Sequence, residues 1–250
     1  MNRKNPSNFN SGYLRYTFLN SGQQKLKKER EILKAAEKLF FRKGFLHAKM
    51  EEIAAEAGFS KVTIYSYFGS KENLYMAITF GALQHLIDLF YQKVDEHKTL
   101  TGIESFLALS DAYFDFCTHE RDYAELLQNY QYIADIAISG KELDQSSRAM
   151  QESIYYRKIR DVQNLPLQIS VEEIKRGQRD GSIVENVNPW LINNLLWSMA
   201  IGYASVNRRP EAEAFMETPT DLWKASYIQI LERVCNGTFD ITSSKNNESP

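Results

Sequence analysis

The stretch Phe59–Tyr75 reads FSKVTIYSYFGSKENLY and mixes aromatic rings, hydroxyls and lysines more densely than the rest of the chain. Ser60 can cap a helix through its hydroxyl, and the next glycine can end one, so the stretch predicts a short helix from Ser60 to Phe68. Ile64 and Phe68 stand four residues apart and share the inner face of that helix. Hydroxyls and amines remain for the outer face, where contacts with phosphates and base edges require such groups.

Two more helices are predicted immediately before this one. Residues Lys27–Lys43 form an amphipathic pattern that Gly44 ends, and Met50–Ala57 form a shorter one that Gly58 ends. Three helices within about 45 residues, with a Gly-Phe-Ser turn between the second and third, are typical of a helix-turn-helix. In that motif the last helix enters the major groove of DNA and the helix before it braces it.

Charge is distributed unevenly along the chain. Residues 1–80 hold 14 Lys and Arg against 7 Asp and Glu, whereas the remaining residues hold 16 against 25. A basic segment on an otherwise acidic chain points to a partner such as nucleic acid. A solvated basic tail without a partner is the alternative that the charge pattern leaves open.

The overall composition is that of an ordinary globular protein, with 250 residues, 43% hydrophobic and 25% charged, which predicts one large domain or two small ones. No apolar run approaches the roughly 20 residues that span a bilayer, and the first residues lack the apolar core of a secretory signal. Cys117 and Cys235 are expected to be buried free thiols. The sequence therefore predicts a cytoplasmic protein that has no membrane partner.

Residues 50–75, MEEIAAEAGFSKVTIYSYFGSKENLY, resemble the DNA-binding domain of the TetR family of transcriptional regulators. The family pattern has an Ile-Ala pair, an Ala-Gly-Φ-Ser turn, a Thr-Φ-Tyr-x-Tyr/His-Phe helix and a Ser/Asn-Lys-Glu/Asp-x-Leu helix start. The matching segments here are Ile53-Ala54, Ala57-Gly58-Phe59-Ser60, Thr63-Ile64-Tyr65-Ser66-Tyr67-Phe68 and Ser70-Lys71-Glu72-Asn73-Leu74. The resemblance covers about Lys25 to Leu86, a quarter of the chain.

The resemblance implies an all-α fold. An N-terminal three-helix helix-turn-helix DNA-binding domain would precede a C-terminal helical ligand-binding and dimerisation domain. The expected division is a poorly ordered N-terminal extension over 1–24, the DNA-binding domain over 25–86, the ligand-binding and dimerisation domain over 87–236, and a polar tail over 237–250.

The resemblance also implies roles for residues of the motif. Thr63 would contact the operator and Tyr67 a phosphate or base edge, while Tyr65 is left open between the core and a phosphate. Lys71 would pair with a phosphate beside the amides of its helix N-terminus. The complete predicted DNA-binding set, over a helix-turn-helix from about Lys49 to Phe68 and the next helix start, is Lys49, Ser60, Lys61, Val62, Thr63, Tyr65, Ser66, Tyr67 and Lys71.

Lys49 departs from the family, which usually has Thr at this cap position. A lysine side chain has no acceptor for a capping bond, so either the cap is lost or the helix start shifts. A phosphate contact by Lys49 is the hypothesis that follows.

The remaining chain is predicted to be helical over 71–94, 102–118, 121–138, 141–162, 171–179, 189–206 and 220–235, with a break at Leu165-Pro166. The stretch IKRGQRDGSIVENVNPWLINNLLWSMAIGY resembles the family's C-terminal part, in which the last two helices pack against a second subunit. The candidate positions, undivided between interface and core, are Leu191, Leu195, Met199, Leu222, Tyr227 and Leu231.

A pocket for a hydrophobic or aromatic effector is expected among aromatic and aliphatic side chains at helical spacing, for which ordinary core packing is the alternative. These residues are Phe106, Tyr113, Phe116, Tyr123, Leu127, Tyr130, Tyr155, Tyr156 and Trp197.

No motif in the sequence indicates catalysis. The histidines are scattered, and there is no P-loop or GxSxG, so we expect no metal, no cofactor and no catalytic residue. The predicted function is a homodimeric repressor that leaves a palindromic operator in double-stranded DNA when an unidentified small-molecule effector binds. Control by a protein partner is the first alternative, and an enzyme in the C-terminal helices is the second.

Overall fold

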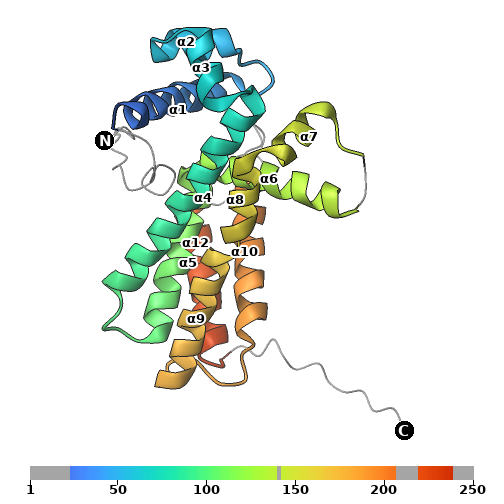
Figure 1. The fold of residues 1–250 in the computed structure, drawn as a ribbon. Coiled ribbons are helices and arrows are strands. Elements are labelled where there is room, and N and C mark those ends of the chain that lie inside the picture. The colour runs from blue at the N-terminus through green and yellow to red at the C-terminus, as the bar shows by residue number, and fades with distance from the viewer. Residues whose placement is uncertain (1–22, 140–141, 207–218, 239–250) are drawn as a thin grey trace. The chain divides into compact units, whose positions relative to one another are not determined.

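The computed structural model describes residues 23–139, 142–206 and 219–238, and over these residues the chain is helical and contains no strand (Figure 1). The all-α prediction is therefore confirmed. The helices are α1 (Gln23–Lys43), α2 (Met50–Ala57), α3 (Lys61–Phe68), α4 (Lys71–Glu96), α5 (Gly102–His119), α6 (Arg121–Ser139), α7 (Gln145–Glu152), α8 (Ile154–Val162), α9 (Leu165–Asp180), α10 (Pro189–Val206) and α12 (Thr220–Cys235). The predicted N-terminal extension and polar tail lie almost wholly outside the described residues.

Three predicted helix boundaries are wrong, and the first is the start of α1, which lies at Gln23 and not at Lys27. The helix expected over 141–162 is two helices, α7 and α8, because Ser153 is the N-cap of α8 and its hydroxyl accepts a hydrogen bond from Tyr155 N at 3.1 Å. The helix expected from 171 begins at Leu165, and Pro166 lies in its first turn, where no amide hydrogen is needed. The predicted break at Leu165-Pro166 is thus a helix start.

The described helices divide into two compact units that are not contiguous in sequence. The first unit takes residues up to Asp88 together with 122–163, so it holds α1–α3, the first part of α4, and α6–α8. The second unit takes 89–121 and the residues from Asn164 onward, so it holds the end of α4, α5, α9, α10 and α12. The predicted boundary between a DNA-binding and a ligand-binding domain at residue 86 stays a prediction. The packing differs from that boundary, because it groups α6–α8 with α1–α3.

The first unit is built on apolar contacts of α1 with α2 and of α2 with α3. Its fully buried side chains include Ile32, Ile53 and Ile64. Polar contacts attach α6: Tyr123 donates its hydroxyl hydrogen to Glu37 Oε1 of α1 at 2.7 Å. Burial raises the pKa of the Glu37 carboxyl, and the Tyr123 hydrogen bond opposes that rise.

The second unit is organised around α5, which packs against α9, α10 and α12. Phe114 of α5 is buried between rings of the two last helices, with ring centroids 5.1 Å from Tyr203 and 5.3 Å from Tyr227. Cys117 and Cys235 are buried here and form no disulfide, as predicted. Among the described helices, none is long and apolar enough to cross a membrane.

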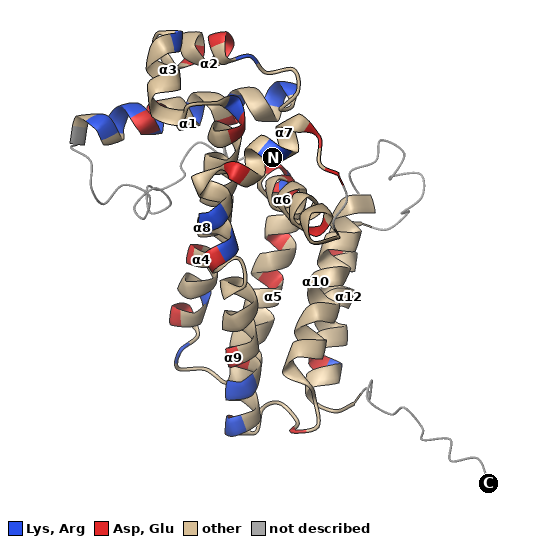
Figure 2. Cartoon of the chain, turned by 45° about the vertical axis from the view of Figure 1, so that its right-hand side comes forward, with Lys and Arg blue, Asp and Glu red and all other residues tan. Residues whose placement is uncertain are grey.

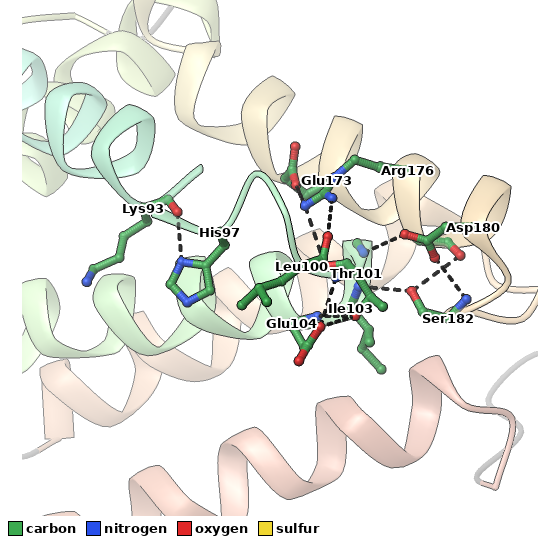
Figure 3. A network of polar contacts seen from close by, with 12 residues as sticks. Lys93, His97, Leu100, Thr101, Ile103, Glu104, Glu173, Arg176, Asp180 and Ser182 are labelled. Carbon is green, nitrogen blue, oxygen red and sulfur yellow. Dashed lines mark hydrogen bonds and ion pairs between the residues drawn. The ribbon is translucent and has the colours of Figure 1, made fainter. Parts of the chain in front are cut away.

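The N-terminus of α5 is anchored to α9 by a network of polar contacts (Figure 3). Asp180 accepts from Gly102 N at 2.7 Å, and the Ser182 hydroxyl accepts from Ile103 N at 3.1 Å, so side chains from outside α5 satisfy two of its free amides. Arg176 donates to Leu100 O at 2.6 Å and thereby ties α9 to the preceding loop.

Glycine is required at the crossing of α5 and α9. A Cβ on Gly102 would lie closer than 3 Å to three backbone atoms of Arg176 and Gly177. Backbone atoms cannot move away as a flexible side-chain end can, so Gly102→Ala should lower the free energy of unfolding by about 3 kcal/mol or more. Denaturant unfolding measures this, with the exposed loop change Thr99→Ala as a control that should stay within about 0.5 kcal/mol. Equal midpoints for the two variants would contradict the close crossing.

Candidate DNA-binding surface

The turn between α2 and α3 is formed by Gly58 and Ser60. Gly58 adopts a left-handed conformation with φ of 71°, which favours glycine, and it ends α2. Ser60 then caps α3, because its hydroxyl oxygen accepts a hydrogen bond from Thr63 N at 3.1 Å. The predicted helix-turn-helix geometry and the predicted role of Ser60 as a cap are confirmed.

Helix α3 has two chemically different faces. Ile64 and Phe68 are fully buried, as their four-residue spacing predicts. Val62 is 79% exposed and Tyr65 is 41% exposed, so the ring of Tyr65, left open by the sequence, lies toward the outer side. The remaining predicted contacts also reach the surface of α3: Lys61 and Ser66 are exposed, while Thr63 and Tyr67 are half-buried.

Lys61 is the cation of this outer face. Its ammonium pairs with Glu51 of α2 and lies 5.7 Å from the centre of the Tyr65 ring. The hydrogen bond from Lys61 lowers the pKa of the Glu51 carboxyl, but both groups are exposed, and exposed pairs contribute little to stability. A phosphate can therefore replace Glu51 at low cost. Figure 2 shows the acids of α2 close to basic residues, the other exposed pairs being Lys38–Glu56 and Lys43–Glu52.

Lys49 is the N-cap of α2 and makes no capping bond with its side chain, so of the two alternatives left open by the sequence it is the cap that is lost. The helix nevertheless starts at Met50, as predicted. Glu52 compensates in part, because its carboxylate accepts from Lys49 N at 3.3 Å. The exposed Lys49 side chain remains a predicted phosphate contact.

Lys71 has a bracing role that the sequence analysis did not foresee. Its ammonium donates to Phe45 O at 2.9 Å and to Ala48 O at 3.2 Å, and it lies 4.3 Å from the centre of the Phe45 ring. The side chain thus ties the loop between α1 and α2 to the start of α4. A phosphate contact by Lys71 stays a prediction, which would use the third ammonium hydrogen.

The nine predicted pocket residues do not lie in one compact unit. Phe106, Tyr113, Phe116 and Trp197 belong to the second unit, and only Tyr113 and Trp197 of these four line a common gap, with stacked rings 4.6 Å apart. The other five belong to the first unit and are Tyr123, Leu127, Tyr130, Tyr155 and Tyr156.

The gap beside Tyr113 and Trp197 is a seam between side chains of the second unit that is too narrow for a water molecule. Asn193 and Tyr227 line it and are 1% and 3% exposed, yet the amide nitrogen of one and the hydroxyl of the other have no hydrogen-bond partner. Burial raises the pKa of Tyr227, and the nearby Ser110 hydroxyl opposes that rise; Ser110 gives its own hydrogen to Phe106 O at 2.8 Å. The full lining is Phe90, Leu109, Ser110, Tyr113, Ser170, Asn193, Leu196, Trp197 and Tyr227.

Sequence reasoning missed Asn193 and Tyr227 as candidates for this seam. Tyr227 is among the predicted positions that are undivided between interface and core, and Asn193 is not among the predicted site residues. The usable signal was an amide side chain within an apolar helix, because a buried amide needs partners and is rarely retained without a reason.

An exposed apolar face runs along α10 and α12. Leu191, Leu195 and Met199 recur every four residues on α10 and are 42%, 43% and 37% exposed, and Leu222 of α12 is 56% exposed. Helix α10 carries no charged residue, and Figure 2 shows it without blue or red. Tyr227 and Leu231 are buried, so the structure places them in the core and the other four candidates at the surface.

No group of three or more His, Cys, Asp or Glu side chains within 23–139, 142–206 and 219–238 could hold a metal ion.

The sequence matches the family model described as bacterial regulatory proteins, tetR family, over residues 32–78. The HTH-type transcriptional activator FasR of Mycolicibacterium smegmatis is 29% identical over 111 residues, which are 44% of this chain and 50% of FasR. The HTH-type transcriptional repressor NicS of Pseudomonas putida is 41% identical over 61 residues, which are 24% of this chain and 27% of NicS. The chain thus spans half or less of the length of these curated relatives.

The solved structure of the transcriptional regulator FadR from Bacillus subtilis, in complex with stearoyl-CoA, has a similar fold. The TM-score is 0.58 at 16% sequence identity, and the match covers 82% of this chain and 98% of FadR. At this identity the likeness concerns the fold alone. The residues that match the family model contain all of α2 and α3, with the turn and the two-faced helix described above. The family-model match over residues 32–78, the relatives and the fold together support a regulator of the TetR family.

Proposed function

We propose that this chain is a sequence-specific DNA-binding transcriptional regulator of the cytoplasm, a repressor that a small molecule releases from its operator. The observation that carries the proposal is the two-faced α3, which buries Ile64 and Phe68 while Val62 stands 79% exposed in its first turn. A valine methyl suits contact with a thymine methyl, and the neighbouring Lys61 supplies the positive charge that phosphates attract.

The proposed regulator acts as a homodimer on a palindromic site. The support is the apolar face of α10, where the exposed side chains of Leu191, Leu195 and Met199 recur every four residues and so share one side of the helix, together with the exposed Leu222 on α12. A twofold interface is self-complementary and presents two copies of α3 to two equal half-sites.

The proposed effector binds at the seam of the second unit. Asn193 and Tyr227 offer unpaired donors there, and burial raises the pKa of Tyr227 so that its hydroxyl keeps its proton. Among the described residues that line the seam there is no Lys, Arg or His, so against these residues an anionic group would be buried without a countercharge. The effector class that fits is a neutral, largely apolar molecule with a carbonyl or similar acceptor oxygen, and its entry must widen the seam.

Selection of bound DNA from a random pool tests the proposed DNA binding. We expect enrichment of a palindrome whose half-site centres lie about 34–36 Å, one helical turn, or a multiple of it apart. Enrichment of no sequence, with binding that depends on salt alone, would show that the protein only binds DNA electrostatically.

Unfolding temperatures with small probes test the effector site. Without ligand, Asn193→Leu and Tyr227→Phe should unfold at the same or a higher temperature than the natural chain, because each change removes an unpaired buried donor. Acetophenone should raise the unfolding temperature of the natural chain by a few degrees, and of the two variants by much less. Ethylbenzene lacks the acceptor oxygen and benzoate is charged, so neither should raise the unfolding temperature as much as acetophenone does.

The exposed change Tyr132→Phe is the control for the loss of a tyrosine hydroxyl, because Tyr132 is 66% exposed. It should respond to acetophenone as the natural chain does. A response to benzoate as large as that to acetophenone, or an undiminished response in Tyr227→Phe, would contradict the proposed site.

A further inference from the structure

Asn73, in the first turn of α4, joins the end of α3 to a residue far away in sequence. Its side-chain nitrogen donates to Phe68 O at 2.8 Å, and Phe68 is the last residue of α3. Its side-chain oxygen accepts from the Ser153 hydroxyl at 2.6 Å. Both ends of the amide are therefore used, and all three residues lie in the first compact unit.

Ser153 can fix the position of Asn73 relative to α8, because its hydroxyl also makes two hydrogen bonds. It gives its hydrogen to Asn73 and accepts from Tyr155 N at 3.1 Å, which caps α8. Ser153 is only 5% exposed, so water does not offer a ready substitute for either partner. A second contact lies beside it, where the Ser146 hydroxyl of α7 donates to Glu72 Oε1 at 3.1 Å.

Helix α3 depends on such outside contacts for its orientation. It has eight residues, and helices this short are not stable alone. Ile64 and Phe68 hold its inner face, while the carbonyl at its C-terminal end accepts from the Asn73 side chain and, also at 2.8 Å, from Ser70 N of the connecting turn. Tyr67, a predicted DNA contact, is the residue just before that carbonyl.

We propose that the hydrogen-bonded chain from Ser153 through Asn73 to Phe68 O positions α3 for reading DNA, and that the start of α8 is thereby part of the DNA-reading apparatus. This inference rests on the proposed DNA-binding function. Ser153 and Asn73 are positioning residues, since they act on DNA through α3. Because they carry no charge, their loss should weaken sequence discrimination and leave the attraction to phosphates unchanged.

The test compares Ser153→Ala, Asn73→Leu and the double variant in the full-length chain. Affinities are measured for the operator found by selection, for the same operator with one half-site base pair changed, and for unrelated DNA at several salt concentrations. Each single variant should bind the operator about tenfold more weakly, lose most of its preference over the altered operator, and keep the affinity and salt slope for unrelated DNA. The double variant should lose no more than Asn73→Leu alone, because both changes break one chain of bonds.

Asp144→Ala is the matched control. Asp144 caps α7 by accepting from Ser147 N at 2.9 Å, so its loss costs a helix cap as Ser153→Ala does, with no contact to Asn73. It should lower the unfolding temperature about as much and leave the discrimination intact. Undiminished discrimination in Ser153→Ala and Asn73→Leu, additive losses in the double variant, or equal losses in Asp144→Ala would overturn the inference. Failure of the natural chain to prefer any operator would instead refute the proposed function.

Discussion

A chain that carries Thr63→Ala together with Tyr67→Ala should bind its operator at least about a thousandfold more weakly than the natural chain while remaining folded and dimeric. Each lost contact to a base edge or phosphate costs about 1–3 kcal/mol, and a dimer loses it in both half-sites. The core should be unaffected, because the buried side chains of α3 are Ile64 and Phe68, which are unchanged.

Fluorescence anisotropy with labelled operator measures the affinity, and circular dichroism with sedimentation velocity verifies the fold and the dimer. Thr99→Ala with Tyr132→Ala removes the same two kinds of side chain at exposed positions outside the motif and should leave the affinity unchanged. Operator affinity within threefold of the natural value in the Thr63 and Tyr67 variant would mean that another face reads the DNA.

Leu195→Asp should convert the dimer to a monomer and, as a consequence, remove operator binding at concentrations that saturate the natural chain. Leu195 is 43% exposed and lies one turn from both Leu191 and Met199 on the charge-free α10. In a twofold interface each carboxylate would be buried without a cation, and the cost would be incurred twice. Sedimentation velocity measures the mass directly.

Ile138→Asp is the matched control for this change. Ile138 lies on α6 and is 85% exposed, so the same kind of substitution is made on an exposed aliphatic residue outside the proposed interface. It should leave the dimer intact. A dimer that survives Leu195→Asp at micromolar concentration would move the interface away from α10.

The helix-turn-helix could be predicted because its signals are local. Ser60 caps α3 as its type suggests, and Gly44, Gly58 and Gly69 all adopt positive φ where the sequence ends a helix. The spacing of Ile64 and Phe68 was enough to assign the buried face.

The C-terminal part was less predictable because its helices are apolar on several sides. Leu222 and Leu231 of α12 belong to the same undivided set of interface-or-core candidates, but one is 56% exposed and the other 2% exposed, and periodicity alone does not separate them. The division between α7 and α8 depends on Ser153, whose partner Asn73 is 80 residues away in sequence. The bracing contacts of Lys71 could not be predicted either, because they depend on the fold. Its acceptors are backbone carbonyls, which every residue type supplies, so the sequence does not mark them.

The two compact units have a consequence for how the DNA-contacting end can be exchanged between relatives. Tyr123 and Asn129 of α6 reach Glu37 of α1 and Tyr75 of α4, and the Tyr155 ring of α8 lies 6.2 Å from the Phe80 ring of α4. Helices α6 and α8 therefore pack against α1 and α4. A hybrid protein joined at residue 88 would combine the proposed DNA-contacting helices with the second part of a relative, and residues 122–163 of this chain would be lost. To transfer operator specificity from one relative to another, residues 122–163 must therefore be exchanged together with the motif helices. The alternative is to exchange only the side chains on the outer face of α3.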